Sequence, residues 1–236
     1  MKPLFLLISL WYCSASYCQG SNAGISSNSG GIWPSQVTVS DISGLPFLNK
    51  HPNIDGHPFW DSVYRPSIMV LSTGKGFSNV DARIDLEEQI IYFKDASGAA
   101  MVTAPGFIKE FQYPVAGDSN KYVVFRSGYA ASDYFPNTQF YMVMVDGFSP
   151  LLKAIHKEVE VAKDQMSGAV RSNYQETEAL FLYQDGQLIR VKKDRDFFLT
   201  RFHEKHKEIE AYLKANRLNL KKEADLIKLI KYYNSL

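Results

Sequence analysis

The chain has few cysteines, no hydrophobic run long enough to cross a membrane, and none of three common catalytic motifs. Its two cysteines, Cys13 and Cys18, both lie near the N-terminus of the 236 residues. If this end is removed, the mature domain has no disulfide framework, no thiol nucleophile and no thiolate metal site. No Gly-x-Ser-x-Gly elbow, phosphate loop or zinc-protease helix occurs.

The first residues follow the order of a secretory signal peptide. Lys2 supplies a positive charge, Leu4 to Tyr12 are apolar, and small residues come next. This apolar run is far shorter than the roughly 20 residues that a membrane-spanning helix needs. We therefore expect residues 1–18 to be a cleaved signal peptide and the protein to be exported, to the periplasm, the outer membrane or the cell exterior. No transmembrane segment is expected after cleavage.

The composition is that of a packed globular protein whose charge is unevenly distributed. Hydrophobic residues make up 45% of the chain and aromatic residues 14%, and the net charge is +1. A net charge this small argues against nucleic acid as a partner. Residues 192–236 carry twelve Lys or Arg and seven Asp or Glu, a net of +5, which leaves the body acidic.

Three regions follow the signal peptide. Residues 19–44 are rich in Gly, Ser and Asn, which predicts a flexible leader. Residues 45–193 contain short runs of β-branched and aromatic residues separated by turn signals, which is typical of antiparallel strands. Residues 194–236 change to a helical period with lysines opposite the apolar stripe. The sequence thus predicts one α+β domain: an antiparallel meander or half-barrel followed by two or three C-terminal helices packed on it.

Two Asp-Gly pairs raise the question of whether Asp146 and Asp185 are catalytic carboxylates. Each pair lies between two apolar runs, the second of which ends in basic residues. Asp-Gly tolerates the positive φ angles of hairpin turns, whereas catalytic carboxylates need a concave, partly dry site. We interpret both pairs as turns.

An aromatic stretch, "SGYAASDYFPNTQFYM", is the leading candidate for a contact surface. Tyr129, Tyr134 and Phe135 lie in a predicted loop between strands. Exposed aromatic rings on a β scaffold can stack on sugars or on a partner protein, although such rings also pack inside domains. We predict a binding role for these three residues toward a protein or glycan of the cell envelope.

A second cluster, "HPNIDGHPFWDS", offers an alternative metal site at His51, Asp55, His57 and Asp61. A calcium loop starting at His51 fails because Ser62 stands where a bidentate Glu is needed. The alternative interpretation is a Pro-rich turn that leads Phe59 and Trp60 into the core. No cofactor is predicted.

Several stretches together carry a family resemblance: "DGHPFWDSVYRPSIMVLSTGKGFSNVDARIDLEEQIIYF", the hairpins "MVDGFSPLLKA" and "YQDGQLIRVKK", and the ending "IEAYLKANRLNLKKEADLIKLIKYYNSL". They resemble a group of uncharacterised exported proteins of Bacteroidota, across most of residues 45–236. The group resembles this chain in its signal peptide, β-rich body and lysine-rich helical end. The resemblance implies a location in the bacterial envelope and implies no activity or catalytic residue.

These observations predict an exported envelope protein that acts by binding or by structural interaction and not by catalysis. The alternative is a hydrolase that uses a metal or carboxylate site near residues 51–61.

Overall fold

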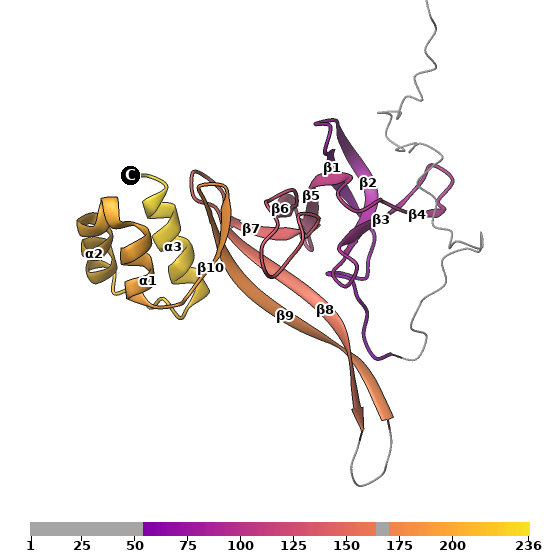
Figure 1. Ribbon diagram of the computed structural model, residues 1–236. Coiled ribbons are helices and arrows are strands. Elements are labelled where there is room, and N and C mark those ends of the chain that lie inside the picture. The colour runs from indigo at the N-terminus through magenta and orange to yellow at the C-terminus, as the bar shows by residue number, and fades with distance from the viewer. Residues whose placement is uncertain (1–53, 164–169) are drawn as a thin grey trace, which may run out of the picture.

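The computed structural model describes residues 54–163 and 170–236, and the strands of this part form one open antiparallel sheet (Figure 1). Their order across the sheet is β10-β9-β8-β7-β6-β5-β1-β2-β3-β4. The strands are β1 (Arg65–Leu71), β2 (Gly76–Asp85), β3 (Ile90–Lys94), β4 (Ala100–Val102), β5 (Ile108–Val115), β6 (Asp118–Arg126), β7 (Tyr141–Val145), β8 (Leu151–Lys163), β9 (Val170–Gln184) and β10 (Gln187–Arg190). The helices are α1 (Arg195–Arg201), α2 (His206–Ala215) and α3 (Glu223–Tyr233), with a short 3-10 helix at His203–Lys205. The predicted α+β fold is confirmed.

The turn between β2 and β3 contacts β8 and so bends the first half of the sheet around an apolar core. The backbone N–H of Lys157 donates to the carbonyl of Leu86 (3.1 Å). The side-chain amide of Gln89 donates to the carbonyls of Leu86 (2.8 Å) and Ile155 (3.1 Å). These bonds satisfy backbone N–H and C=O groups that have no hydrogen-bond partner on a neighbouring strand. The core inside the bend is aromatic and aliphatic, with Phe93, Phe111 and Phe125 among its fully buried side chains.

The helices pack against one face of β7–β9, with α3 next to the sheet and α2 farther out (Figure 1). Leu226, Leu229 and Ile230 follow the helical period of α3 and are completely buried, so the sequence folds this segment as an amphipathic helix with its apolar stripe toward the sheet. Strand β9 supplies Leu180 and Leu182 to the same apolar cluster. The helical tail therefore packs on the sheet.

The opposite face of β7–β9 is covered by the aromatic loop, which we define as residues 128–140. Alternate residues of β9 point to opposite faces, so Phe181 faces this loop while its neighbours face the helices. The loop and the helices thus enclose the same part of the sheet from two sides.

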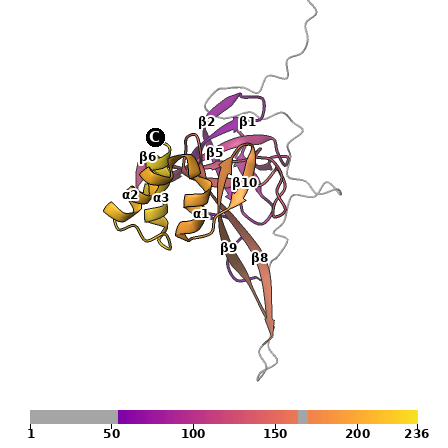
Figure 2. The ribbon, with the colours of Figure 1, turned by 60° about the vertical axis from the view of Figure 1, so that its left-hand side comes forward.

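Strands β8 and β9 continue beyond the body as a projecting hairpin (Figures 1 and 2). We call residues 158–163 with 170–175 the arm. Its side chains are mostly exposed, including Val161 and Val170 at 63% each. The described N-terminal segment meets the arm edge, where Asp55 forms a parallel bridge with Asn173.

Both Asp-Gly pairs lie between paired strands, and the pair at 185–186 forms the predicted turn. Asp185 (φ 51°) and Gly186 (φ 77°) are the two residues between β9 and β10, and both adopt the left-handed conformation of a type I′ hairpin. Asp146 and Gly147 follow β7 and begin the connection to β8.

Candidate functional site at the aromatic loop

The three predicted aromatic residues occupy different positions in the aromatic loop. Tyr129 is only 8% exposed, and its ring makes edge contacts with Tyr141 (5.6 Å between centroids) and Tyr183 (4.9 Å). Tyr129 therefore anchors the start of the loop to the sheet. Burial raises the pKa of its hydroxyl.

Phe135 is half-buried and anchors the middle of the loop. Its ring makes edge contacts with Phe181 (6.0 Å) and Tyr141 (6.3 Å). A tight turn holds it there, because the hydroxyl of Ser132 accepts hydrogen bonds from the N–H groups of Tyr134 (3.3 Å) and Phe135 (3.2 Å). This turn places the two successive aromatic rings at the edge of the loop.

Tyr134 is the exposed member of the set, at 54%. One edge of its ring rests on Phe181, with centroids 5.9 Å apart. The guanidinium of Arg190, on the short strand β10, lies 5.2 Å from the centre of the same ring, within the range of a cation–π contact. The ring is thus held in place by two neighbours while much of it stays open to solvent.

A small cleft of about 140 Å³ opens beside Tyr134. Ala154 and Ala179 stand directly opposite each other on β8 and β9, and their short side chains leave the space. This volume is below the ~300–1,000 Å³ of typical small-molecule sites, so the cleft fits one side chain or one ring of a larger partner. We call it the aromatic cleft; its lining includes Tyr134, Phe135, Ala154, Thr177, Ala179 and Arg190.

A charged network stands at the start of the loop. Arg126 donates to Glu110 (2.9 Å) and to both oxygens of Asp146 (3.0 and 2.9 Å). These hydrogen bonds hold the pKa of Asp146 below its usual range and raise the pKa of Arg126. Asp146 is therefore an ionised partner of Arg126 in a turn, and this geometry gives it a structural role.

The alternative metal residues are held by structural contacts where the structure describes them. Asp61 pairs with Arg65 (3.0 Å). Burial works against ionisation of Asp61, but hydrogen bonds from the backbone of Val63 and from Arg65 outweigh it and lower its pKa. Asp55 bridges to β9, and the carbonyl of His57 accepts from the ammonium of Lys157 (3.3 Å).

His51, the fourth residue of that set, lies outside the described residues. Within residues 54–163 and 170–236, no three His, Cys, Asp or Glu side chains gather closely enough to hold a metal ion. The metal site at residues 51–61 stays a prediction.

Comparisons with known proteins assign the chain to no family. No protein-family model, no curated protein and no solved structure matches the chain. Among the described residues, no helix has the length and apolar character needed to cross a membrane.

Sequence reasoning missed Arg190, Ala154 and Ala179, although one signal was available for Arg190. The two-residue Asp185-Gly186 turn pairs Gln184 with Gln187, and this register places Arg190 opposite Phe181. No comparable local signal places the two alanines opposite each other, because β8 and β9 are joined by a longer connection.

Proposed function

We propose that the protein is an exported envelope component that binds a partner protein, without catalysis, through the aromatic cleft. The observation that carries this proposal is the exposed Tyr134 ring beside the Arg190 guanidinium at the mouth of the cleft. Export is supported by the signal-peptide pattern of residues 1–18.

Residue type and rigidity favour binding at this position. Tyrosine and arginine are enriched among the residues that dominate binding energy in protein interfaces. The Tyr134 ring already rests on Phe181 and Arg190, so little side-chain freedom is lost when a partner arrives.

The size of the cleft favours a protein partner over a small ligand. A space of about 140 Å³ accepts one side chain, and the remaining contact area has to come from the surface around it. The same sheet face continues from the cleft onto β8 and β9, where Thr177 stands opposite His156 and Gln175 opposite Glu158. This extended polar surface can form the rim of an interface.

To test this proposal, tagged protein of residues 19–236 is crosslinked to its partners in the native envelope and purified. Mass spectrometry then identifies the captured proteins. Tyr134→Ala and Arg190→Ala are compared with Tyr122→Ala, an exposed tyrosine (38%) on β6. We expect one dominant protein to be captured by the parent protein and the control, and at least about tenfold less by the two cleft variants, since each removes a central contact.

Equal capture by folded cleft variants would overturn the assignment. Release of the captured material by an oligosaccharide, with no protein enriched, would identify a glycan as the partner instead. Tyr129 and Phe135 are unsuitable for this test because their replacement removes packing inside the loop.

A further inference from the structure

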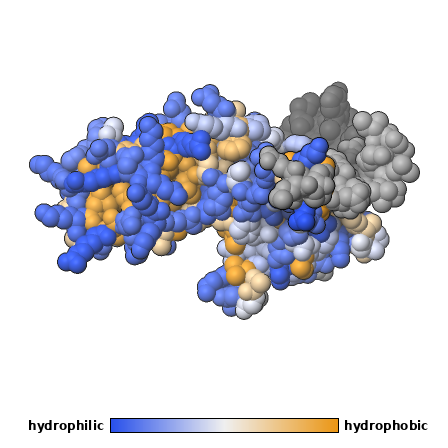
Figure 3. Space-filling model, turned by 90° about the horizontal axis from the view of Figure 1, so that it is seen from below, coloured by the Kyte–Doolittle hydropathy of each residue, from blue (hydrophilic) through white to orange (hydrophobic). Residues whose placement is uncertain are grey.

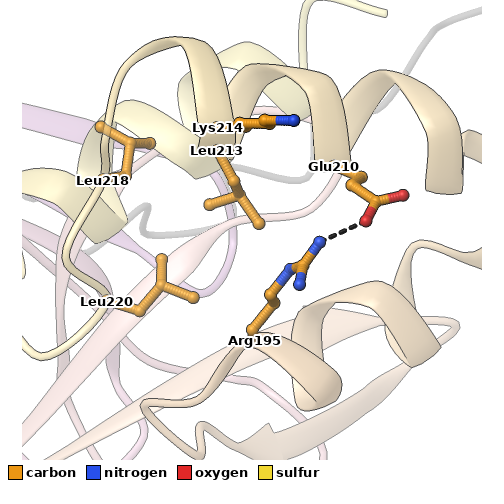
Figure 4. A pocket seen from close by; sticks show the side chains of 6 residues that line it. All are labelled: Arg195, Glu210, Leu213, Lys214, Leu218 and Leu220. Atoms are coloured by element: carbon orange, nitrogen blue, oxygen red, sulfur yellow. Dashed lines mark hydrogen bonds and ion pairs between the residues drawn. The ribbon is translucent and has the colours of Figure 1, made fainter.

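A second hollow lies in the helical tail, apart from the aromatic cleft and independent of the function proposed for it. Its volume is about 450 Å³, which is within the ~300–1,000 Å³ of small-molecule sites. It opens between the start of α1, the end of α2 and the connection to α3 (Figure 4). Six residues line it: Arg195, Glu210, Leu213, Lys214, Leu218 and Leu220.

The floor of the hollow is made by three leucines whose positions follow from how α2 ends. The N–H of Leu218 donates to the carbonyl of Leu213 (3.1 Å), and the N–H of Arg217 donates to that of Lys214 (3.3 Å). This pair of bonds is a Schellman motif, which brings the two leucines together. Arg217 is in the left-handed conformation (φ 48°) that the motif requires.

The connection after the motif is also held in place by hydrogen bonds within the chain. The N–H of Asn219 donates to the carboxylate of Asp225 (3.0 Å) at the start of α3. The side chain of Asn219 in turn accepts from the N–H of Lys221 (3.0 Å). Leu220, between these two residues, is 8% exposed and completes the apolar floor.

The rim of the hollow is cationic on balance. Arg195 forms an ion pair with Glu210 across the opening, as the dashed line in Figure 4 shows. Lys214, one turn further along α2, adds a second cation, and its ammonium has no ion-pair partner among the described residues. The surrounding segment, residues 192–236, carries a net charge of +5.

The apolar floor and the cationic rim together favour a ligand with a hydrocarbon chain and a negatively charged head group. Figure 3 shows apolar surface over the helices, bordered by hydrophilic side chains, on the face seen from below. A hydrocarbon chain would gain from burial against the leucines, and an anionic head would gain from Lys214 and Arg195. A cationic head would find only the carboxylate of Glu210 as a partner, and Arg195 already holds that carboxylate.

We propose that this hollow binds a single-chain anionic amphiphile, with the hydrocarbon chain on Leu213, Leu218 and Leu220 and a carboxylate head at Lys214 and Arg195. The occupant is a monomeric fatty acid. It is not a membrane surface, because Leu213 and Leu220 are only 7% and 8% exposed.

The experiment measures binding of dodecanoate by titration calorimetry, below its micelle concentration, to residues 19–236. Dodecyltrimethylammonium, which has the same chain with a cationic head, is the matched ligand. Lys214→Glu and Leu218→Asp are compared with Lys231→Glu, an exposed lysine of α3 that does not line the hollow. Circular dichroism verifies that each variant is folded.

We expect saturable binding of one dodecanoate per chain and no saturable binding of the cationic ligand. Lys214→Glu should weaken binding at least about fivefold, because it removes an exposed ion pair worth up to about fivefold and also places a carboxylate beside the anionic head. Leu218→Asp should weaken it further, while Lys231→Glu should leave it unchanged.

Three results would overturn the proposal. The first is equal binding of the two ligands, which would indicate hydrophobic association alone. The second is equal weakening by Lys214→Glu and Lys231→Glu, which would indicate a general effect of charge. The third is binding to anionic phospholipid vesicles but not to monomeric dodecanoate, which would identify a membrane-surface face.

Discussion

The two faces of β7–β9 are covered in different ways. The helix-side cluster is mainly aliphatic, with leucines and isoleucines at helical spacing. The loop-side cluster is mainly aromatic, with Tyr129, Tyr141 and Phe181 as its large members. Both clusters bury their share of the sheet, although only one covering element has regular secondary structure.

The difference follows from the geometry of the covering element. A helix presents an apolar residue at every third or fourth position, so medium-sized side chains fill the interface continuously. An irregular loop contacts the sheet at few points, and aromatic rings bury ~150–250 Å² each at those points. The loop also leaves one ring, Tyr134, partly outside the cluster, where a partner can reach it.

The largest expected effect comes from removing one large side chain from each face. Phe181→Ala should destabilise the fold by about 3–5 kcal/mol and Leu182→Ala by about 2–5 kcal/mol, because both side chains are fully buried. Hydrogen exchange should show lost protection in residues 128–140 for the first variant and in α1–α3 for the second. Identical exchange patterns would mean that the two faces do not behave separately.

A smaller effect is expected at the charged contact between the sheet and α3. The ammonium of Lys153 pairs with Glu178 (3.2 Å) and Glu223 (2.7 Å), and its side chain is 11% exposed. Lys153→Met should lower the free energy of unfolding by about 1–2 kcal/mol, because two carboxylates lose their cation. Lys228→Met, which removes an exposed pair with Asp225, should cost under about 0.5 kcal/mol in the same denaturant titration.

A gain in stability is expected at the end of α2 on the helix side. Arg217→Gly should raise the free energy of unfolding by about 1 kcal/mol, because glycine adopts the left-handed conformation without the penalty of a side chain. Gln89→Gly is the matched contrast. Gln89 has a similar backbone (φ 56°), but its side chain makes buried hydrogen bonds, so this change should destabilise. Destabilisation by both variants would contradict the assigned motif at Arg217.

The smallest effect on stability is expected at Asp146, which links the aromatic loop to the helices that cover the other face of the sheet. Its carboxylate binds Arg126, next to the aromatic loop, and its carbonyl accepts from Asn234 at the end of α3. Because Arg126 lowers the pKa of Asp146 in the folded state, this contribution is present above the unfolded pKa of about 3.9 and is lost as pH falls below it.

Urea unfolding is measured at pH 6 and at pH 3 for the wild-type protein and for Asp146→Asn. Between these two pH values, the free energy of unfolding should fall by about 0.5–1 kcal/mol more in the wild-type protein than in the variant. Parallel losses in the two proteins would show that the ion pair contributes nothing to stability.

Much of the fold could be predicted from local patterns. The Asp-Gly pair at residues 185–186 specified a hairpin, and the apolar stripe that includes Leu226 and Ile230 specified a helix, because both signals depend on neighbours in sequence. Leu229 lies three residues after Leu226 on the same apolar stripe and is also fully buried.

The candidate site was only partly predictable. Its loop was found from Tyr129, Tyr134 and Phe135, but the sequence does not distinguish a ring that anchors a loop from a ring that remains exposed. The opposing Ala154 and Ala179, which create the cleft, are 25 positions apart and meet through strand pairing.

The sequence alone determined an α+β chain with turns at its Asp-Gly pairs and a basic helical end, since hydrophobic period and turn chemistry act over a few residues. Only the tertiary structure decided that Tyr129 is buried and Tyr134 exposed, and that Arg190 lies against Tyr134. The same holds for Arg195, which pairs with Glu210 in the middle of α2. These relations join side chains from separate elements, and which of them meet depends on how the sheet, loop and helices pack as a whole.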